Sequence, residues 1–259
     1  MMIDVQSQPG SGMDIDKVGI CDLSYPIEVL DKAQEKQHTI AQINMYVDLP
    51  RRFKGTHMSR FIAVLNQNRA EIMVNNMGEI LRDIASSLEA KSAHIELAFK
   101  YFLEKEAPIS KLRSLMGYDC RFLATYNRGG DEDFILEVKA PVMNVCPCSK
   151  EISKTAAHNQ RSEVTVQLRY SDFVWIEDVI QLIERSASCD LYALLKRVDE
   201  KYVTERAYEN PRFVEDIVRL IADNLMKDKR VLWFTVQSIN YESIHNHNAY
   251  AYIQRDKRS

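Results

Sequence analysis

Two hydrophobic patterns alternate along the first half of the chain, one with a period of two residues and one with a period of roughly 3.6 residues. Apolar and polar residues alternate in four stretches, 38–49, 93–103, 117–127 and 132–142. Such alternation is typical of strands that bury one face. Between the first two stretches, apolar residues recur every three or four positions, first from Thr56 to about Leu65 and then from Ile72 to Leu88. This spacing predicts two helices.

Local residues indicate where some of these elements begin and end. Thr56 is expected to cap the first helix, because its hydroxyl can accept a hydrogen bond from an unpaired amide of the first turn. Gly129-Gly130-Asp131 predicts a hairpin between the last two strands. Further along, Asn210-Pro211 is expected to open a helix, with Asn as the cap and Pro at the first position.

The second half repeats this order of elements without repeating the residues. Strands are predicted at 162–170, 230–240 and 249–254. A helix at 173–187 precedes the helix opened by Asn210, so both halves have strands, two helices and strands. The order favours an α+β protein with an antiparallel sheet and helices on one face. Residues 1–17 contain Pro and Gly but no apolar pattern, and are expected to be a disordered lead-in.

Composition narrows the class of protein without changing the predicted fold. The 259 residues are 46% hydrophobic and 27% charged, with a net charge of −3, as in an ordinary globular protein. No nucleic acid and no membrane is expected as a partner, and no apolar run approaches the roughly 20 residues of a spanning helix. Cys21, Cys120 and Cys189 are scattered among the five cysteines, which favours a reducing cytoplasm over a disulfide framework.

The segment Val145-Cys146-Pro147-Cys148-Ser149-Lys150-Glu151 is followed closely by His158. Clustered Cys and His in an intracellular chain indicate a metal or catalytic site more often than a disulfide. The alternative is two small buried thiols and an unrelated histidine, but the neighbouring Pro, Ser and Lys are not typical of a core. A catalytic metal site uses three protein ligands and keeps one open position. Cys146 and His158 supply two of them.

The spacing leaves the third ligand open. Asp199 and Glu200 lie in a predicted polar link between helices, where a carboxylate could turn inward, although a solvated acid is the more ordinary interpretation of Glu200. His245 and His247 lie in the turn before the last strand, where paired histidines seldom serve packing. Either pair could complete a metal site with Cys146.

Six separated motifs occur in order along the chain. They are Gly55-Thr56-His57-Met58-Ser59-Arg60-Phe61, Cys146-Pro147-Cys148-Ser149-Lys150-Glu151, His158-Asn159-Gln160-Arg161, Glu200-Lys201-Tyr202-Val203-Thr204-Glu205, Phe213-Val214-Glu215-Asp216 and Glu242-Ser243-Ile244-His245-Asn246-His247. Together they resemble the motifs of the GTP cyclohydrolase IB family. The resemblance covers about residues 18–254, and the motifs show no departure from the family pattern.

The resemblance implies a tunnelling fold of two tandem ββααββ-like units, residues 18–145 and 146–259, in agreement with the repeated order of elements. It also implies a cytoplasmic homotetramer with active sites at subunit interfaces. Members of the family hydrolyse a cyclic amidine, converting GTP and water to 7,8-dihydroneopterin triphosphate and formate for folate and queuosine synthesis.

The resemblance further implies a metal site and its ligands. One divalent metal per site would be bound by Cys146, His158 and Glu200. This set mixes thiolate, imidazole and carboxylate, so zinc, manganese or ferrous iron would fit. Catalytic roles near the metal are implied for Cys146, Cys148, His245 and His247. Among these, His245 is the first candidate for proton transfer and His247 the second.

Substrate contacts are implied as well. Glu215 would bind the guanine ring. Other substrate-binding positions are His57, Arg60, Lys150, Arg161 and Lys201. The chain has no glycine-rich phosphate loop, so the triphosphate would depend on basic side chains near the motifs, with Lys154 and Arg206 as further members of that rim.

Three alternatives remain open. The archaeal-type cyclohydrolase of the same superfamily makes a cyclic phosphate of dihydroneopterin and shares the metal residues. The nitrile reductase of queuosine synthesis shares the fold, but the metal-ligand positions His158 and Glu200 and the absence of a nicotinamide fingerprint count against it. A non-enzymatic module could instead use Cys146, Cys148, His158 and one later histidine as a closed structural zinc site.

Overall fold

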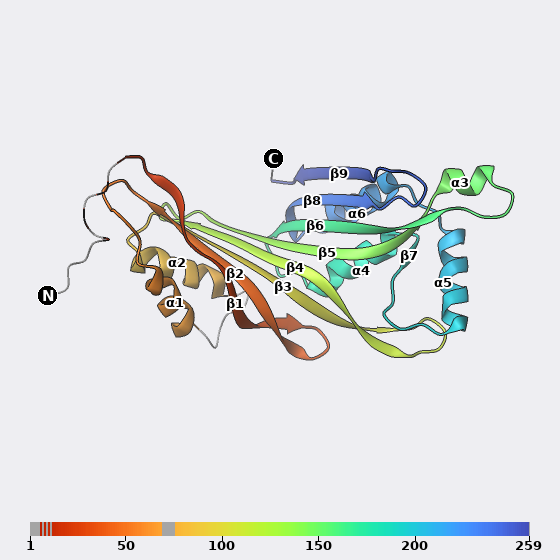
Figure 1. Cartoon of the computed structure of the whole chain (residues 1–259), viewed down its shortest axis with the longest axis horizontal. Helices are drawn as coiled ribbons and strands as arrows, with labels where there is room; N and C mark the ends of the chain where they lie inside the picture. Colours follow the sequence, from red (N-terminus) through yellow and green to blue (C-terminus); the bar gives the residue numbers. More distant parts are fainter. Residues whose placement is uncertain (1–5, 7, 9, 11, 69–75, 259) are drawn as a thin grey trace. The chain divides into compact units, whose positions relative to one another are not determined.

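The computed structural model describes residues 6, 8, 10, 12–68 and 76–258, and in this part of the chain nine strands form one sheet (Figure 1). The strands are β1 (Ile15–Asp31), β2 (Glu35–Leu49), β3 (Ser92–Glu106), β4 (Arg113–Asn127), β5 (Glu132–Val145), β6 (Asn159–Tyr170), β7 (Cys189–Asp190), β8 (Val231–Asn240) and β9 (Ala249–Asp256). The helices are α1 (Met58–Gln67), α2 (Met77–Ser87), α3 (Pro147–Ile152), α4 (Ile176–Ser186), α5 (Arg197–Glu209) and α6 (Val214–Lys227). The strand order is β1-β2-β3-β4-β5-β6-β8-β9, with β7 paired to β5. The predicted α+β class, with an antiparallel sheet and helices on one face, is confirmed.

The chain divides into two compact units that interleave in sequence. Unit 1 comprises Met1–Lys100 and Arg121–Leu136, and unit 2 comprises Tyr101–Cys120 and Glu137–Ser259. Strands β3, β4 and β5 therefore each contribute residues to both units. Strand β1 begins at Ile15, inside the segment 1–17 that the sequence suggests as a lead-in. The predicted boundary between repeats after residue 145 stays a prediction.

Unit 1 is built on the strand predicted at 38–49. In β2 the alternate residues Ala41, Ile43, Met45 and Val47 are at most 1% exposed, and β1 and β3 pair antiparallel on its two sides. Helices α1 and α2 turn their apolar stripes inward, with Phe61, Leu65, Ile80 and Ile84 fully buried. The predicted second helix is observed from Met77, whereas its first apolar positions, Ile72 and Val74, lie outside the described residues.

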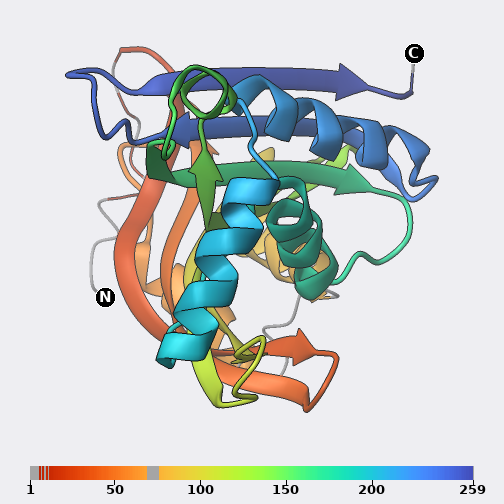
Figure 2. The same cartoon turned by 90° about the vertical axis from the view of Figure 1, so that its right-hand side faces the viewer.

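Unit 2 contains the antiparallel pairs β6–β8 and β8–β9. Helices α4 and α6 pack against each other, and α6 also contacts β8 and β9. Figure 2 shows both helices on the same side of these strands. The buried side of α6 consists of Val214, Ile217, Val218, Ile221, Ala222 and Leu225. The apolar spacing of the sequence predicts this face except for Ala222, but it also predicts Phe213 as buried, and Phe213 is 41% exposed just before the helix.

Both predicted helix caps are wrong. Helix α1 begins at Met58 with His57 at the cap position and no side-chain cap, so the Thr56 hydroxyl lies one residue too early to serve. Helix α6 begins only at Val214, and its first turn is closed by Asp216, which accepts the N–H of Phe213 at 2.9 Å. Asn210 instead ends α5, where its side-chain amide donates to the carbonyls of Ala187 and Ser188. The position of a helix cap depends on where the buried side of the helix begins. The residues near the cap do not show that position by themselves.

Helix α5 occupies the stretch that the sequence suggests as a polar link. Only Asp199, Val203 and Ala207 are buried in it, so one residue per turn faces the protein and the apolar stripe is too narrow to predict. Asp199 is fully buried and anchors the helix to the β3–β4 connection. It accepts the N–H groups of Ile109 and Ser110, the Ser110 hydroxyl, and the N–H of Lys196, all within 2.9 Å.

Asp199→Asn is expected to lower the melting temperature at pH 7, because an amide N–H₂ would face donors that the carboxylate now accepts. Burial by itself would raise the pKa of Asp199, but the Ser110 hydroxyl and then the surrounding N–H groups hold that pKa well below its usual range. The charged carboxylate therefore stabilises the fold above the unfolded pKa of about 3.9, and this contribution is lost as the pH falls toward the folded pKa. Thermal unfolding followed by circular dichroism at pH 7 and at lower pH measures both effects.

A matched control is Glu209→Gln, an exposed carboxylate on the same helix. It should leave the melting temperature unchanged. The difference between wild type and Asp199→Asn should shrink at acid pH, and a difference that is constant with pH would contradict the role assigned to the charge.

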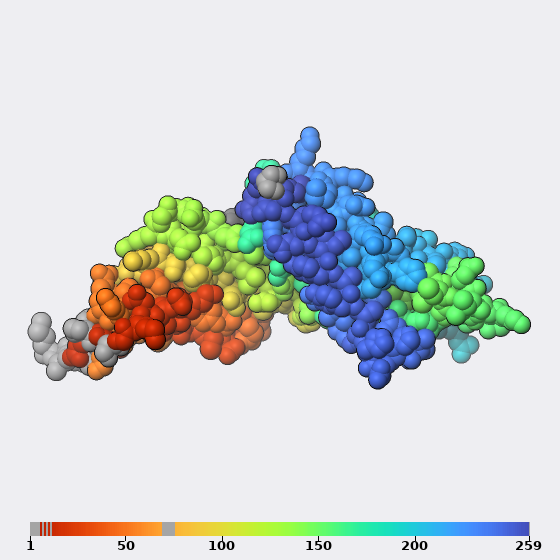
Figure 3. Space-filling view, turned by 90° about the horizontal axis from the view of Figure 1, so that it is seen from above, coloured from red at the N-terminus to blue at the C-terminus, as the bar shows by residue number. Residues whose placement is uncertain are grey.

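Strand β9 is an edge of the sheet. It lies on the face seen in Figure 3, next to α6, and carries the exposed side chains of Tyr250 and Tyr252. An edge strand presents unpaired backbone groups that another chain can pair with. None of the helices in the described ranges has the length and apolarity to cross a bilayer.

Candidate active site

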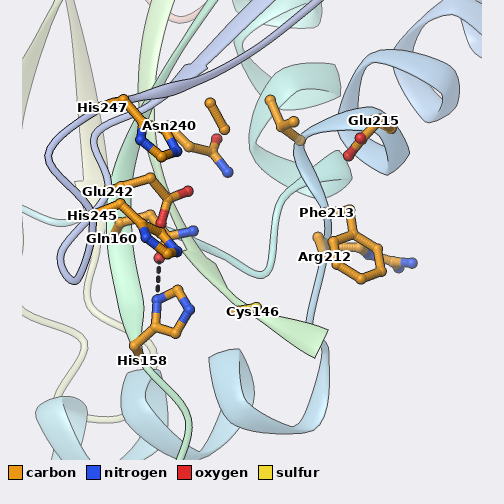
Figure 4. A pocket seen from close by; sticks show the side chains of 12 residues that line it. Cys146, His158, Gln160, Arg212, Phe213, Glu215, Asn240, Glu242, His245 and His247 are labelled. Carbon is orange, nitrogen blue, oxygen red and sulfur yellow. Dashed lines mark hydrogen bonds between the residues drawn. The ribbon is translucent and has the colours of Figure 1, made fainter. Parts of the chain in front are cut away.

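A pocket in unit 2 gathers polar residues from three separate parts of the chain (Figure 4). Its lining residues are Cys146, His158, Gln160, Arg212, Phe213, Val214, Glu215, Asn240, Glu242, His245, His247 and Ala249. The volume is about 280 Å³, close to the lower end of small-molecule sites, which is roughly 300 Å³. The first wall comes from the end of β5 and the start of β6, the second from the start of α6, and the third from the β8–β9 connection.

The first wall is a closed loop that holds Cys146 beside His158. Cys146 occupies the cap position of α3, where its sulfur accepts the N–H of Ser149 at 3.4 Å and Pro147 begins the helix. The Ser149 hydroxyl in turn accepts the N–H of His158 at 3.1 Å, and the Cys146 N–H donates to the His158 carbonyl at 3.1 Å. Ser149 thus connects both candidate ligands, which explains why the motif has a serine at this position.

The imidazole of His158 is oriented by Gln160, the second residue of β6. The two side chains are joined between His158 Nδ1 and Gln160 Oε1 at 3.1 Å (Figure 4). A carbonyl oxygen can only accept, so Nδ1 carries the proton and Nε2 keeps its lone pair. Metal-binding histidines typically donate one ring N–H to such a partner. Gln160 is 6% exposed, so this orientation is held within the protein.

The second wall is the start of α6. Arg212 precedes this helix and donates its backbone N–H to the Val145 carbonyl at 3.0 Å, which ties the second wall to the first. Its side-chain Nε is buried with no hydrogen-bond partner in the described part of the chain. One turn on, the carboxylate of Glu215 is directed toward the pocket from the opposite side to His158 (Figure 4). A helix N-terminus favours a negative charge at this position.

The third wall is the connection between β8 and β9. Glu242, His245 and His247 line the pocket from it, and the two imidazoles stack with ring centroids 5.1 Å apart. Both histidines are exposed. The prediction that this His-Asn-His turn serves chemistry rather than packing stays a prediction.

A comparison with family models matches residues 2–251 to the family described as type I GTP cyclohydrolase folE2. The chain belongs to the FolE2 family. It is 55% identical over 244 residues to the GTP cyclohydrolase FolE2 of Geobacter metallireducens, covering 94% of this chain and 93% of that relative. It is 54% identical to the FolE2 of Syntrophus aciditrophicus, covering 98% and 100% of the two chains.

Among solved structures, the chain is similar to the uricase of Arthrobacter globiformis, with a TM-score of 0.54, 7% identity and 93% of each chain covered. This likeness shows the fold alone, and the predicted tunnelling fold is confirmed. The family match also confirms the resemblance at the level of a type I GTP cyclohydrolase.

The structure brings together five of the residues that the sequence singles out for FolE2-type chemistry. They are Cys146, His158, Glu215, His245 and His247. Three others of unit 2 lie outside the pocket lining. Cys148 is an exposed thiol on α3, and the Lys150 ammonium donates to the Tyr208 carbonyl. Arg161 is exposed on β6.

The two predicted sites on α5 also lie outside the pocket lining. Glu200 is exposed in the first turn, and Lys201 forms an exposed ion pair with Glu205 at 3.8 Å. The helix itself packs near Cys146, because Val203 and Ala207 form a buried cluster with Val145 and Cys189. Burial raises the pKa of the Cys189 thiol to about 11.

His57 and Arg60 belong to unit 1. They line a separate pocket there with Gly55 and Thr56, and the Arg60 guanidinium donates to the Ser87 carbonyl at 2.6 Å. Neither residue is among those that line the pocket of unit 2.

The donor chemistry of the pocket fits a divalent metal in part. Cys146 offers a sulfur held by a backbone N–H, and His158 offers a ring nitrogen whose orientation is fixed. These are the ligand types that zinc and similar metals take in proteins. Within the ranges that the structure describes, no three His, Cys, Asp or Glu side chains converge closely enough to hold a metal.

Four polar residues of the pocket are not among the site residues that the sequence predicts: Gln160, Arg212, Asn240 and Glu242. Gln160 and Glu242 lie inside the recognised motifs, so their proximity to His158 and His245 was an available signal. Arg212 and Asn240 have no such signal. They reach the pocket only because α6 and β8 are placed beside β5 and β6 by the fold.

Proposed function

We propose that the chain is a type IB GTP cyclohydrolase that converts GTP and water to 7,8-dihydroneopterin triphosphate and formate. The names of its FolE2 relatives support the substrate. The observation that carries the proposal is one pocket holding a thiol, an oriented imidazole, a histidine pair and a carboxylate at a helix start. Ring opening and deformylation of a purine need an activated water, a proton-transfer group and a residue that binds the base. The groups in this pocket can supply all three.

Cys146 and His158 would hold a divalent metal, zinc, manganese or ferrous iron, with Glu200 as the third ligand. When bound, such a metal supplies Lewis-acid activation of water at neutral pH. Gln160 keeps Nε2 of His158 free for this role. The assignment of Glu200 is supported by the packing of α5 against Val145, the residue before Cys146.

The protein's own residues would do the rest of the chemistry. Glu215 would accept the N1–H and the exocyclic amino group of guanine, two adjacent donors that one carboxylate can take together. His245, with His247 as the reserve, would transfer a proton at the imidazole nitrogen that departs when the ring opens. Cys148 would take part in the reaction beside the metal.

The triphosphate would be held by basic side chains. Arg212 is an addition to the basic residues considered from sequence, because it lines the pocket and its Nε is buried without a partner in the described residues. Arginine suits phosphate because its fork can donate two parallel hydrogen bonds. The further members of this basic rim would be Arg60, Lys150, Lys154, Arg161, Lys201 and Arg206, and His57 would be another substrate-binding residue.

Purified protein with GTP and a divalent metal is expected to release formate and to give fluorescent neopterin after oxidation and dephosphorylation of the product. The dephosphorylation step separates two products, because a cyclic phosphate resists a monoesterase that a linear triphosphate chain does not. ATP in place of GTP is the control and should release no formate. Absence of formate with GTP and each of zinc, manganese and ferrous iron would overturn the proposal.

We also propose a cytoplasmic homotetramer with sites shared between subunits. The edge strand β9, with Tyr250 and Tyr252 exposed, offers a surface that another copy could cover. Sedimentation of an active monomer at micromolar concentration would overturn the tetramer.

A further inference from the structure

A chain of buried polar side chains runs beneath the pocket of unit 2 and ends at Asn240. It begins at the backbone N–H of Ser188 and continues through the side chains of Asn144, Ser162 and Asn240. None of these residues is more than 2% exposed. The Ser188 N–H meets Asn144 Oδ1 at 3.2 Å, and Asn144 Nδ2 meets Ser162 Oγ at 2.6 Å. Ser162 Oγ meets Asn240 Oδ1 at 2.6 Å. Buried polar groups are normally satisfied, so the direction of each bond can be worked out.

The direction is fixed from the Ser188 end, because a backbone N–H can only donate. Asn144 must therefore use its oxygen toward Ser188, which leaves its Nδ2 to donate to the Ser162 hydroxyl. Ser162 accepts there, so its own proton goes to Asn240. Asn240 consequently accepts through Oδ1, and the second contact of that oxygen, with Asn144 Nδ2 at 3.5 Å, agrees with this assignment.

The remaining group of Asn240 is its amide N–H₂, and it faces the pocket. Figure 4 shows the nitrogen directed into the space between the third wall and the start of α6. The orientation of an Asn amide is ordinarily ambiguous, but here the buried chain sets it. Asn240 is thus a preset hydrogen-bond donor at the start of the third wall, the wall that also carries His245.

The opposite wall presents an acceptor, the Glu215 carboxylate. A purine with donors on one edge and acceptors on the other matches this arrangement. Guanine has N1–H and its amino group on one side, and N7 with O6 along the adjoining edge that leads to C8. We propose that Asn240 Nδ2 donates to the O6/N7 edge of the bound guanine, which makes Asn240 a specificity-determining residue. This inference rests on the proposed function.

The test variant is Asn240→Asp. It has the same shape and keeps an oxygen for the Ser162 hydroxyl, so the buried chain is retained, but the pocket-facing donor becomes an acceptor. Dissociation constants are measured by rapid mixing, before turnover, for GTP, 7-deaza-GTP (no N7) and 6-thio-GTP, which keeps N1–H and replaces the O6 acceptor by a weakly accepting sulfur. For GTP the variant should bind on the order of ten- to a hundredfold more weakly than wild type.

The analogues separate a lost hydrogen bond from a general effect of the new charge. The analogue that lacks the acceptor used by Asn240 should bind to wild type and to the variant with nearly the same affinity. Which analogue behaves in this way shows whether Asn240 donates to O6 or to N7. An equal loss for all three nucleotides would mean repulsion or misfolding and would overturn the inference. Ser162→Ala is the second variant, and it should weaken GTP binding with the same dependence on the analogue, because the amide loses its fixed orientation.

The outcome also distinguishes this inference from the proposed function. If wild-type protein binds GTP and releases formate but Asn240→Asp binds GTP equally well, only the role of Asn240 is wrong. If wild-type protein binds none of the three nucleotides, both are wrong.

Discussion

Cys146→Ala, His158→Ala and Glu200→Ala are each expected to abolish formate release from GTP and to lower the metal content of the purified protein. The reason is that each residue would supply one of three ligands to a single ion, and removing one leaves too few. Metal analysis, circular dichroism and the formate assay together measure the effect. A catalytic metal can be lost from a protein that stays folded, whereas loss of a structural zinc unfolds its domain.

Two further variants make this result specific. Cys21→Ser replaces an exposed thiol of unit 1 and should keep both metal and turnover. His245→Ala should keep the metal but lose turnover by roughly 10²–10⁴-fold, the usual contribution of a general acid or base. Full activity with normal metal content in Glu200→Ala would remove Glu200 from the site and leave the pocket residues Glu242 and His247 as candidates for the third ligand.

Glu215→Ala is expected to lose measurable GTP binding while keeping its metal and its oligomeric state. Hydrogen bonds to a charged group are each worth roughly 1.5–3 kcal/mol, so loss of a pair weakens binding by about a hundredfold or more. Adenine has a lone pair at N1 and no amino group at C2, so the same carboxylate would gain nothing from ATP. Calorimetric titration of the metal-free protein with GTP measures the loss without turnover.

The matched control is Asp223→Asn, an exposed carboxylate further along α6, which should bind GTP as wild type does. Inosine triphosphate adds a second check, because it lacks the amino group and should bind wild type more weakly than GTP. If Glu215→Ala binds GTP with the affinity of wild type, the guanine is recognised by another residue.

Elements with a wide apolar stripe could be predicted from the sequence. Strand β2 alternates fully buried Ile43 and Met45 with partly exposed neighbours, and α6 buries a residue at nearly every helical repeat. Helix α5 could not be predicted, because its contact with the protein is one buried residue per turn and a carboxylate, Asp199, that binds the residue pair Ile109 and Ser110 far away in sequence. Hydrophobic periodicity carries no information about such an anchor.

The residues of the candidate site also fall into some that the sequence predicts and some that it does not. Cys146 and His158 are close in sequence and are joined by one short loop, so their pairing could be predicted from spacing. Arg212 and Asn240 reach the pocket through the contact of Arg212 with Val145 and the pairing of Asn240 with Ser162. Those contacts are decided by the topology of the sheet, and no local pattern reports them.

The three walls of the pocket come from distant parts of the sequence, which affects the order in which the pocket forms as the chain folds. The first wall ends near residue 160, whereas Asn240 and the histidine pair come near the end of the chain. Contacts between residues so far apart form slowly, because the entropy of closing a long loop is lost before they stabilise the fold. During synthesis the thiol and imidazole of the first wall emerge well before the rest of the pocket. A nucleotide that needs all three walls can therefore stabilise only the finished fold, by mass action on the native state, and offers no help to the growing chain.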